Sequence, residues 1–413
     1  MKAVKYLSAF NLENDTACPQ IRLVAPFKKL QAKGQWEVNY AVKHDGDRVT
    51  GVRLDSDKCD VVIFQRHFHA RGQKAKLFRH ILGIKKPIIF EIDDDFINIP
   101  EDHPHANAID QLQPSVLMLL NIATVVTVTN EKLKEVYAPY CRHVEIIPNG
   151  VDTDFWRRSD RRSSDDKVIV GYAGSLTHQE DVEMVVPALE KIMAAYPEKV
   201  ECHFWGCAPE SLKDHSQVVV HETRVMPYEM YVPKFQECAI DIAMAPLCDN
   251  HFNRAKSAIK WGEYSAGSVV GLYSKLPAYE QWVEHGVDGY LCSEDPESWY
   301  QALKVLVEDA DKRQSMGQKA YEKASQHYSV DHMANRWEEV LKLTEESFEP
   351  AYDQQKPVVS VIIPIYNRGD LTKQCLQSLF NIKTNVPFEV IVVNNDSQDD
   401  SRDILKEYED RIR

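Results

Sequence analysis

Residues 146–174 read IIPNGVDTDFWRRSDRRSSDDKVIVGYAG, and they hold the end of one strand pattern and the start of another. IIP closes a series of short β-branched runs that alternate with helix-like segments, and VIVGYAG opens a second such series. RRSDRRSSDD, between them, has no apolar period and is typical of a linker between domains. Because the alternation of strand and helix patterns begins again after the linker, the sequence predicts two domains of similar construction.

Each series has the alternation that predicts a parallel sheet covered by helices. The first-half strands are expected in KAVKYLSA, WEVNYAV, CDVVIFQ, PIIFEI, TVVTVT and HVEIIP, with helices that start near Pro19, Gln73, Pro114 and Asn130. The second-half strands are expected in VIVGYAG, VECHFWG, VVVHE, AIDIAMAP, SVVGLYS and GYLC, followed by helices from Pro296 to about Phe348. We predict two doubly wound α/β domains that face a cleft, over residues 1–155 and 165–348.

Residues 356–413 form a third pattern. VVSVIIPIYN and FEVIVVNNDS have the composition of buried strands, and LTKQCLQSLFN between them is an amphipathic helix. One βαβ unit cannot cover both faces of its sheet, so we expect this segment to be the truncated start of a further domain.

Composition restricts the partners. The chain has 413 residues, 44% of them apolar, and a formal net charge of −14. That acidity argues against general nucleic-acid binding, because a protein that binds the phosphate backbone normally has a basic excess. An anionic ligand would need a local basic pocket.

Three features predict a cytoplasmic protein. The nine cysteines are scattered without a C-x-x-C pair, which favours reduced thiols over a disulfide framework. The N-terminus lacks the apolar core of a signal peptide. The longest apolar run, residues 116–129, is too short to span a bilayer, and peripheral contact with the inner face of a membrane stays open.

HFNRAKSAIKWGEY at residues 251–264 is the main candidate for ligand binding. Lys256, Lys260 and Glu263 are spaced by four and three, which predicts one helical face. With Ser257 as the N-cap, the positive helix end would lie beside Arg254 and both lysines, and would suit a nucleotide diphosphate whose ribose contacts Glu263. The competing interpretation is a solvated stripe with a Lys260–Glu263 ion pair.

Strand ends supply further candidates. Gly174 and Ser175 follow VIVGYA and can offer backbone N–H groups to a phosphate, although a plain turn would look the same. Asp93, Asp94 and Asp95 follow PIIFEI, where they can hold a metal-diphosphate, face an acceptor or cap a helix. The histidines near this cluster in sequence are His67, His69, His103 and His105.

Other polar residues have two interpretations. Arg22 either faces the cleft or pairs with a carboxylate on the surface, and we favour the surface pair. Cys202, His203 and Cys207 are expected to be core-facing strand residues, because no second pair of metal ligands supports them.

Three motifs carry a resemblance to a known family. IIPNGVD at 146–152, FNRAKSAIKWGEYSAG at 252–267 and HGVDGYL at 285–291 resemble glycosyltransferase family 4, retaining sugar-nucleotide enzymes of GT-B fold, over residues 1–345. The resemblance implies a donor on the second domain, an acceptor on the first, and transfer without a metal or other cofactor. Together with the strand ends and the helix start described above, it leads us to expect Lys256, Lys260 and Asp94 as catalytic residues, and as donor-binding residues Gly174, Ser175, Asn253, Arg254, Ser257 and Glu263.

The chain also departs from that family. Glu263 matches the second glutamate of its E-x7-E motif, but Ala255 stands at the place of the first. Ser175 stands where an arginine is expected, and Glu180 near the place of a lysine. We infer that the two lysines of AKSAIK replace these cations.

The tail resembles the opening of glycosyltransferase family 2, whose fold is GT-A. By this resemblance Pro364, Tyr366 and Asn367 border the nucleotide and Asp396 lies near its base. The metal-binding motif and catalytic base of that family would lie beyond Arg413. The pair of resemblances suggests two transferases in tandem.

The sequence thus predicts a retaining glycosyltransferase of GT-B fold that moves a hexose-type sugar from a nucleotide sugar, such as a UDP- or GDP-sugar, to a surface glycan or a lipid-linked glycan. A GT-B epimerase or phosphorylase is the rival enzyme, although nothing marks the pyridoxal lysine that a phosphorylase needs. A degenerate sugar-nucleotide or glycan-binding module that serves the family 2 domain is the rival without catalysis.

Overall fold

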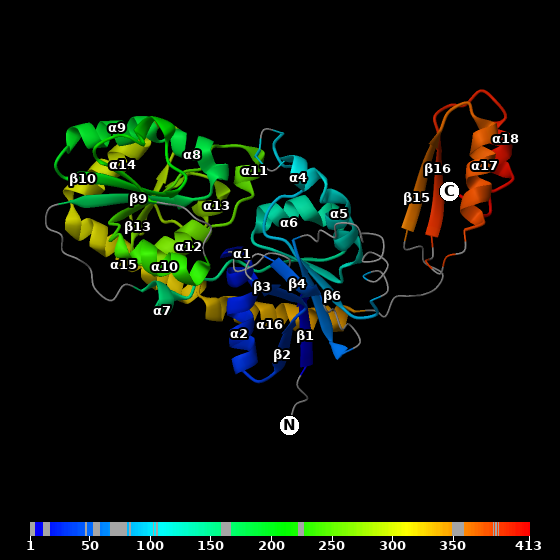
Figure 1. Cartoon of the computed structure of the whole chain (residues 1–413), viewed down its shortest axis with the longest axis horizontal. Coiled ribbons are helices and arrows are strands. Elements are labelled where there is room, and N and C mark those ends of the chain that lie inside the picture. The colour runs from blue at the N-terminus through cyan, green and yellow to red at the C-terminus, as the bar shows by residue number, and fades with distance from the viewer. Residues whose placement is uncertain are drawn as a thin grey trace. The chain divides into compact units, whose positions relative to one another are not determined.

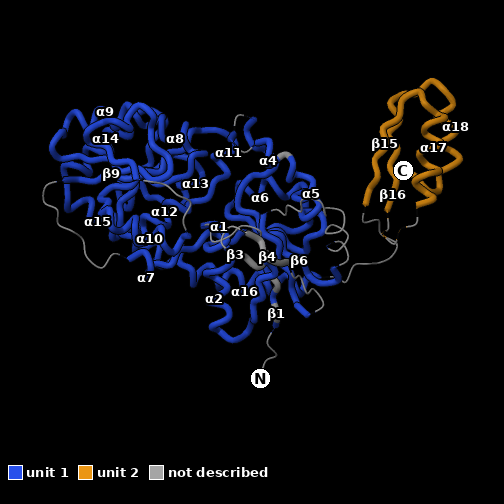
Figure 2. The backbone as a smooth tube through the Cα atoms, viewed as in Figure 1, with its two compact units in different colours: residues 1–348 blue, residues 349–413 orange. Residues whose placement is uncertain are grey.

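The chain was analysed as a computed structural model, which describes residues 5–10, 17–45, 48–52, 58–66, 81, 84–101, 103–104, 106–157, 167–221, 227–348, 359–382, 384, 386 and 388–413. It divides into two compact units, residues 1–348 and 349–413 (Figure 2). The expected helix near Gln73 and most of the expected linker, residues 158–166, lie outside the described residues. Across the described part of the chain, no helix is long and apolar enough to cross a membrane.

Unit 1 contains two six-stranded parallel sheets (Figure 1). The first sheet has the order β2-β1-β5-β6-β7-β8. Its strands are β1 (Lys5–Phe10), β2 (Trp36–Tyr40), β5 (Val61–Gln65), β6 (Ile88–Glu91), β7 (Val125–Val128) and β8 (Val144–Ile146). An antiparallel hairpin of β3 (Val42–Asp45) and β4 (Arg48–Val52), which the sequence pattern did not predict, is separate from this sheet.

The second sheet has the order β11-β10-β9-β12-β13-β14. Its strands are β9 (Val168–Gly174), β10 (Val200–Gly206), β11 (Val218–His221), β12 (Ile242–Ala245), β13 (Val270–Ser274) and β14 (Tyr290–Cys292). Counted along the domain, this is the 3-2-1-4-5-6 order of a dinucleotide-binding sheet, and the strand order reverses between β9 and β12. Ligands of such sheets bind at that switch point, beyond the carboxyl ends of the two strands.

Helices cover both sheets. In unit 1 they are α1 (Ala17–Pro19), η1 (Gln20–Val24), α2 (Ala25–Ala32), α4 (Ala106–Asp110), α5 (Gln113–Ile122), α6 (Glu131–Tyr137), η3 (Ala138–Tyr140), α7 (Thr153–Trp156), η4 (Leu176–His178), α8 (Gln179–Glu183), α9 (Val186–Ala195), η5 (Glu210–Leu212), α10 (Tyr228–Glu237), α11 (His251–Arg254), α12 (Ile259–Ala266), α13 (Pro277–Glu280), α14 (Pro296–Glu308), α15 (Ala310–His327) and α16 (Val330–Ser347). Unit 2 consists of β15 (Val359–Ile365), α17 (Gly369–Phe380), β16 (Phe388–Asn394) and α18 (Ser401–Lys406), with β15 and β16 parallel.

The strands of the second sheet are apolar at successive positions because both faces of this sheet are covered by helices. Val170 and Tyr172 of β9 belong to the core under α9 and α14, whereas Ala173 belongs to the core under α10 and α12. Because successive strand residues point to opposite faces, this sheet is buried on both faces. The predicted pair of doubly wound sheets is confirmed.

The last helix of unit 1 returns to the first sheet. Trp337 of α16 is fully buried among residues of β1, β5 and α2, its ring lies 5.0 Å edge-on from Phe27, and its Nε1 donates to the carbonyl of Arg22. The chain approaches α16 closely at Gly150 of the IPNG turn, where a Cβ would lie 2.8 Å from Met333 Cβ. The glycine of this motif is therefore required by packing.

We expect Trp337→Ala to lower the free energy of unfolding by about 3–5 kcal/mol, because it leaves a cavity where α16 meets the first sheet. Urea denaturation followed by circular dichroism measures this. Lys342→Ala changes a half-exposed side chain of the same helix and should alter stability by less than about 0.5 kcal/mol. Equal midpoints for both variants would contradict this packing.

Candidate functional site

The segment around Lys256 breaks the helix that the sequence pattern predicted. α11 ends at Arg254 and α12 begins at Ile259, so Lys256 lies in the turn between them and does not share a helical face with Lys260 and Glu263. The prediction that Ser257 is the N-cap was wrong. Ala258 occupies that position without a side-chain cap, while Asn250 caps α11 by accepting from the N–H of Asn253.

Two asparagines of the first domain account for this turn. Asn130, after β7, donates from Nδ2 to the carbonyl oxygens of Ala255 (2.9 Å) and Lys256 (3.2 Å). Asn149, after β8, donates to Ser257 Oγ over 2.9 Å. Backbone carbonyls that would bond within a continuous helix bond to the first domain instead. Because these partners are far away in the sequence, helical periodicity does not predict them. The loop after β12 meets the carboxyl end of the first sheet here.

Lys256 makes an ion pair across the same junction. Its Nζ lies 2.7 Å from Oδ2 of Asp94, which follows β6, and 4.1 Å from the centre of the Phe252 ring. The two side chains are 19% and 25% exposed, so water reaches both. Two of the three predicted catalytic residues are therefore in contact, although they are far apart in the sequence.

The three consecutive aspartates have separate environments. Burial opposes the charge of Asp93, but the ion pair with Arg66 (2.6 Å) outweighs it and holds the pKa of Asp93 below its usual range. Asp95 accepts the N–H groups of Ile97 and Asn98, both at 2.9 Å, in a local turn; residues 96–100 are not helical, so this is not the helix cap that the sequence left open. Asp94 pairs with a lysine of the second domain, and Asp95 Oδ2 lies 3.9 Å from Nε2 of His251 in that domain.

The histidines of the metal hypothesis do not join this cluster within the described residues. His67, His69 and His105 lie outside them. The ring of His103 packs 5.3 Å from Phe252. Since Arg66, Lys256 and backbone N–H groups engage the three carboxylates, the described residues show no convergent set of oxygen ligands at this strand end.

Lys260 and Glu263 pair within α12, with Nζ 2.9 Å from Oε2. This is the ion pair of the competing interpretation, but Glu263 is only 3% exposed, so the helix face is not simply solvated. Tyr228 and Tyr231 are neighbours of Glu263, and burial, followed by the charge of Glu263, raises the pKa of both hydroxyls well above the usual range. The hydroxyl of Tyr231 is buried without a hydrogen-bond partner.

Arg254 and Asn253 point elsewhere. Arg254 forms a two-bond ion pair with Asp249 (2.5 and 2.7 Å) and is 53% exposed. Asn253 is buried, and its Nδ2 donates to Asp181 Oδ1 (2.9 Å) and to the carbonyl of Cys248. These two residues hold the loop after β12 in place, and their donor-binding role stays a prediction.

Gly174 and Ser175 form the expected turn after β9. Ser175 is exposed and precedes η4, and its Oγ lies 2.5 Å from Thr177 Oγ1. A Cβ on Gly174 would lie 2.1 Å from the hydroxyl oxygen of Tyr172, so the strand end has no room for a side chain. The turn lies at the switch point of the second sheet, as the loop of Lys256 does.

Arg22 was placed wrongly by the sequence analysis, which favoured a surface pair. It is 1% exposed and donates to Glu91 Oε1 (2.7 Å), to the carbonyl of Ile147 (2.6 Å) and to Asn149 Oδ1 (3.1 Å). Burial raises the pKa of Glu91, although the positive charge of Arg22 acts to lower it. A cation within the apolar stretch QIRLVAP and a glutamate that ends the buried strand IIFE were the signals for this pair.

Comparison with known proteins gives two different results for the two units. The family model "Glycosyl transferase family 2" matches residues 360–413. The chain is 40% identical over 65 residues to validoxylamine A glucosyltransferase of Streptomyces hygroscopicus subsp. jinggangensis (strain 5008), which is 16% of this chain and 15% of that protein. It is 43% identical over 51 residues to poly(ribitol-phosphate) beta-glucosyltransferase of Bacillus spizizenii, which is 12% of this chain and 8% of that protein. The chain thus spans less than a sixth of the length of these relatives.

Solved structures resemble a much larger share of the chain. Sucrose-phosphate synthase of Thermosynechococcus elongatus superposes with a TM-score of 0.60 at 12% identity over 83% of this chain and 100% of that one. HepE of Anabaena, in complex with UDP-glucose, superposes with a TM-score of 0.58 at 14% identity over 82% of this chain and 100% of that one. At these identities the likeness shows the fold, and the predicted GT-B architecture is confirmed.

Proposed function

We propose that unit 1 is a retaining glycosyltransferase that moves a hexose-type sugar from a nucleotide sugar to a glycan or lipid-linked glycan acceptor. The observation that carries the proposal is the position of Lys256, in the loop after β12, against Asp94 at the carboxyl end of the first sheet. The UDP-glucose complex of HepE, a structure that superposes over 82% of this chain, supports a nucleotide-sugar donor.

The Lys256–Asp94 pair can be exchanged for a diphosphate at small cost. Ion pairs that water reaches contribute only about 0–1 kcal/mol, and both side chains of this pair are partly exposed. A diphosphate brings more than one negative charge, and the free N–H groups at the start of α12 add to the attraction. Both lysines then stabilise the charge that builds on the departing diphosphate.

Release of Lys256 has a consequence for Asp94. When the donor takes the lysine, the Asp94 carboxylate loses its partner and faces the space where the acceptor hydroxyl meets the sugar. Asp94 then orients that hydroxyl and accepts its proton as the glycosidic bond forms. Retention at the anomeric carbon is the outcome expected from the resemblance to family 4.

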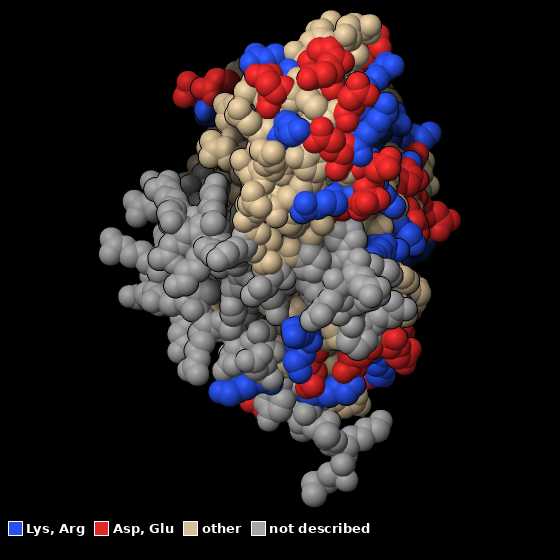
Figure 3. Space-filling model, turned by 90° about the vertical axis from the view of Figure 1, so that its right-hand side faces the viewer, with Lys and Arg blue, Asp and Glu red and all other residues tan. Residues whose placement is uncertain are grey.

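The charge distribution is compatible with a small anionic ligand. On the face shown in Figure 3, Lys and Arg side chains are interspersed with Asp and Glu, and the described residues there form no broad basic area. Recognition of a nucleic-acid backbone needs such an area. Lys256 and Lys260 instead supply local positive charge for a diphosphate.

A binding module without catalysis is the second candidate, because both lysines already hold carboxylates and the cations expected at positions 175 and 180 are absent. Assay of a panel of UDP- and GDP-sugars for hydrolysis and for transfer to glycan acceptors separates the two. We expect release of the nucleotide diphosphate with one of the donors, and its loss in a Lys256→Ala/Lys260→Ala double variant. Donor binding without turnover across the panel would favour the binding module.

Excess chelator should leave the transfer rate unchanged, because side chains and a helix end supply the positive charge that a metal supplies elsewhere. The measurement is nucleotide release with and without EDTA, with a known metal-dependent transferase as the control that EDTA must stop. Abolished transfer, restored by added Mg²⁺ or Mn²⁺, would make the aspartate cluster a metal site.

A further inference from the structure

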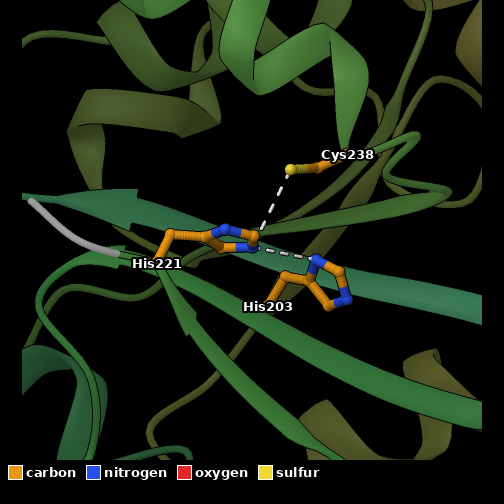
Figure 4. A group of neighbouring side chains, drawn as sticks. All are labelled: His203, His221 and Cys238. Atoms are coloured by element: carbon orange, nitrogen blue, oxygen red, sulfur yellow. Dashed lines mark hydrogen bonds between the residues drawn. The ribbon is translucent and has the colours of Figure 1, made fainter.

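A group of metal-type ligands lies at the outer edge of the second sheet. His203 of β10, His221 of β11 and Cys238 at the end of α10 come together in Figure 4. The register pairs Trp205 with His221, and His203 is two residues from Trp205, so both histidines lie on the same face of the sheet. Cys202, by contrast, lies in the core on the opposite face, as predicted.

The ligand atoms have the spacing of one coordination sphere. His221 Nε2 lies 3.1 Å from His203 Nδ1 and 3.8 Å from Cys238 Sγ, and all three atoms lie within 4.8 Å of one another. Zinc binds nitrogen at about 2.0–2.1 Å and sulfur at about 2.3 Å in a tetrahedron, which sets the distances between ligand atoms at about 3.3–3.6 Å. The two distances from His221 Nε2 are each about 0.2 Å outside this range, and the His203–Cys238 pair would close to it from at most 4.8 Å.

The surrounding residues orient the two rings. His203 Nε2 lies 2.8 Å from Glu201 Oε1, so its proton sits on Nε2 and its Nδ1 lone pair faces His221. A carboxylate on the far nitrogen is the usual partner of a metal-binding histidine. The His221 ring stacks on Trp205 with 4.0 Å between centroids and 4° between planes, which fixes the ring plane.

We propose that His203, His221 and Cys238 bind one Zn²⁺ ion, with Glu201 as the positioning residue of His203. Three protein ligands leave a fourth tetrahedral position for water, and His221 and Cys238 are only partly buried, so an ion can enter. On binding, the thiol loses its proton, and the His221 proton moves from Nε2 to Nδ1. The ion ties the end of α10 to the edge strands and takes no part in the transfer step.

The test uses the whole untagged chain, depleted of metal. Zinc is titrated against a chromophoric chelator, and Co²⁺ absorption reports sulfur ligation. We expect one Zn²⁺ per chain, a sulfur-to-cobalt charge-transfer band, and a melting temperature that rises with zinc. Cys238→Ser should abolish the band, and Glu201→Gln should weaken zinc binding by about tenfold or more. Both should melt close to the metal-free parent, which shows that they fold.

Matched controls are Cys375→Ser and His332→Ala, since both residues are exposed. Each should bind zinc as the parent chain does. Zinc binding that survives in Cys238→Ser and His221→Ala, or no binding by the parent chain, would overturn the site. Because the readouts are metal content, absorption and melting, the result is independent of whether unit 1 transfers a sugar.

Discussion

Lys256→Ala lowers the rate of sugar transfer by about 100- to 1,000-fold, the loss typical when one group that stabilises transition-state charge is removed. The physical reason is position: Lys256, in the loop after β12, contacts Asp94 at the carboxyl end of the first sheet. Steady-state assay of nucleotide release at saturating donor measures the rate, and the donor KM shows how much of the effect is binding.

Lys191→Ala is the matched control for Lys256→Ala. Lys191 also forms a 2.7 Å pair, with Glu297, but that pair is about half exposed and joins α9 to α14. The control should transfer at the parental rate and melt at the parental temperature. Parental activity of Lys256→Ala, with donor binding intact, would contradict the role given to Lys256.

Arg22→Met lowers the free energy of unfolding by about 3–5 kcal/mol, because it removes the cation that pairs with the buried Glu91 and leaves that carboxyl, among the described residues, only its bond from Gln65. Arg22 also bonds Ile147 and Asn149, where the first domain leads into the second. Urea denaturation measures the loss. Lys29→Met breaks an exposed pair with Asp331 instead and should cost less than about 1 kcal/mol.

A second substitution separates the effect of the unpaired Glu91 charge from the effect of the other hydrogen bonds that Arg22 makes. Adding Glu91→Gln to Arg22→Met removes the uncompensated carboxylate, so the double variant should be more stable than Arg22→Met alone. If Glu91→Gln instead deepens the loss, Arg22 stabilises the fold mainly through its carbonyl and amide bonds. The Lys256–Asp94 pair of the site and this buried pair thus differ in kind: water reaches the former, and the latter is part of the scaffold.

Local pattern was sufficient to predict the strands of both large sheets. Runs such as VIVGYAG and IIFE are buried on both faces, and such short apolar runs are typical of strands in a parallel sheet. The hairpin of β3 and β4 was missed, and its sequence, residues 42–52, has polar and charged residues among its valines. The return of α16 to the first sheet is a tertiary contact that helical periodicity does not specify.

The site was predicted only in part, because local sequence pattern identifies strand ends but not contacts between distant segments. The carboxyl ends of strands drew attention to Asp94 and Lys256, which the structure brings together. The single helix through residues 251–264 was wrong, because Asn130 and Asn149, more than a hundred residues earlier, bond the turn between α11 and α12. Arg22 was misplaced because a buried ion pair depends on a partner in another element.

The most direct measurement is a crystal structure of the chain with UDP or GDP bound. The account predicts the diphosphate at the start of α12, with a phosphate oxygen within hydrogen-bond distance of Lys256 Nζ, and Asp94 no longer paired with that lysine. A diphosphate bound elsewhere, with the Lys256–Asp94 pair unchanged at 2.7 Å, would contradict it.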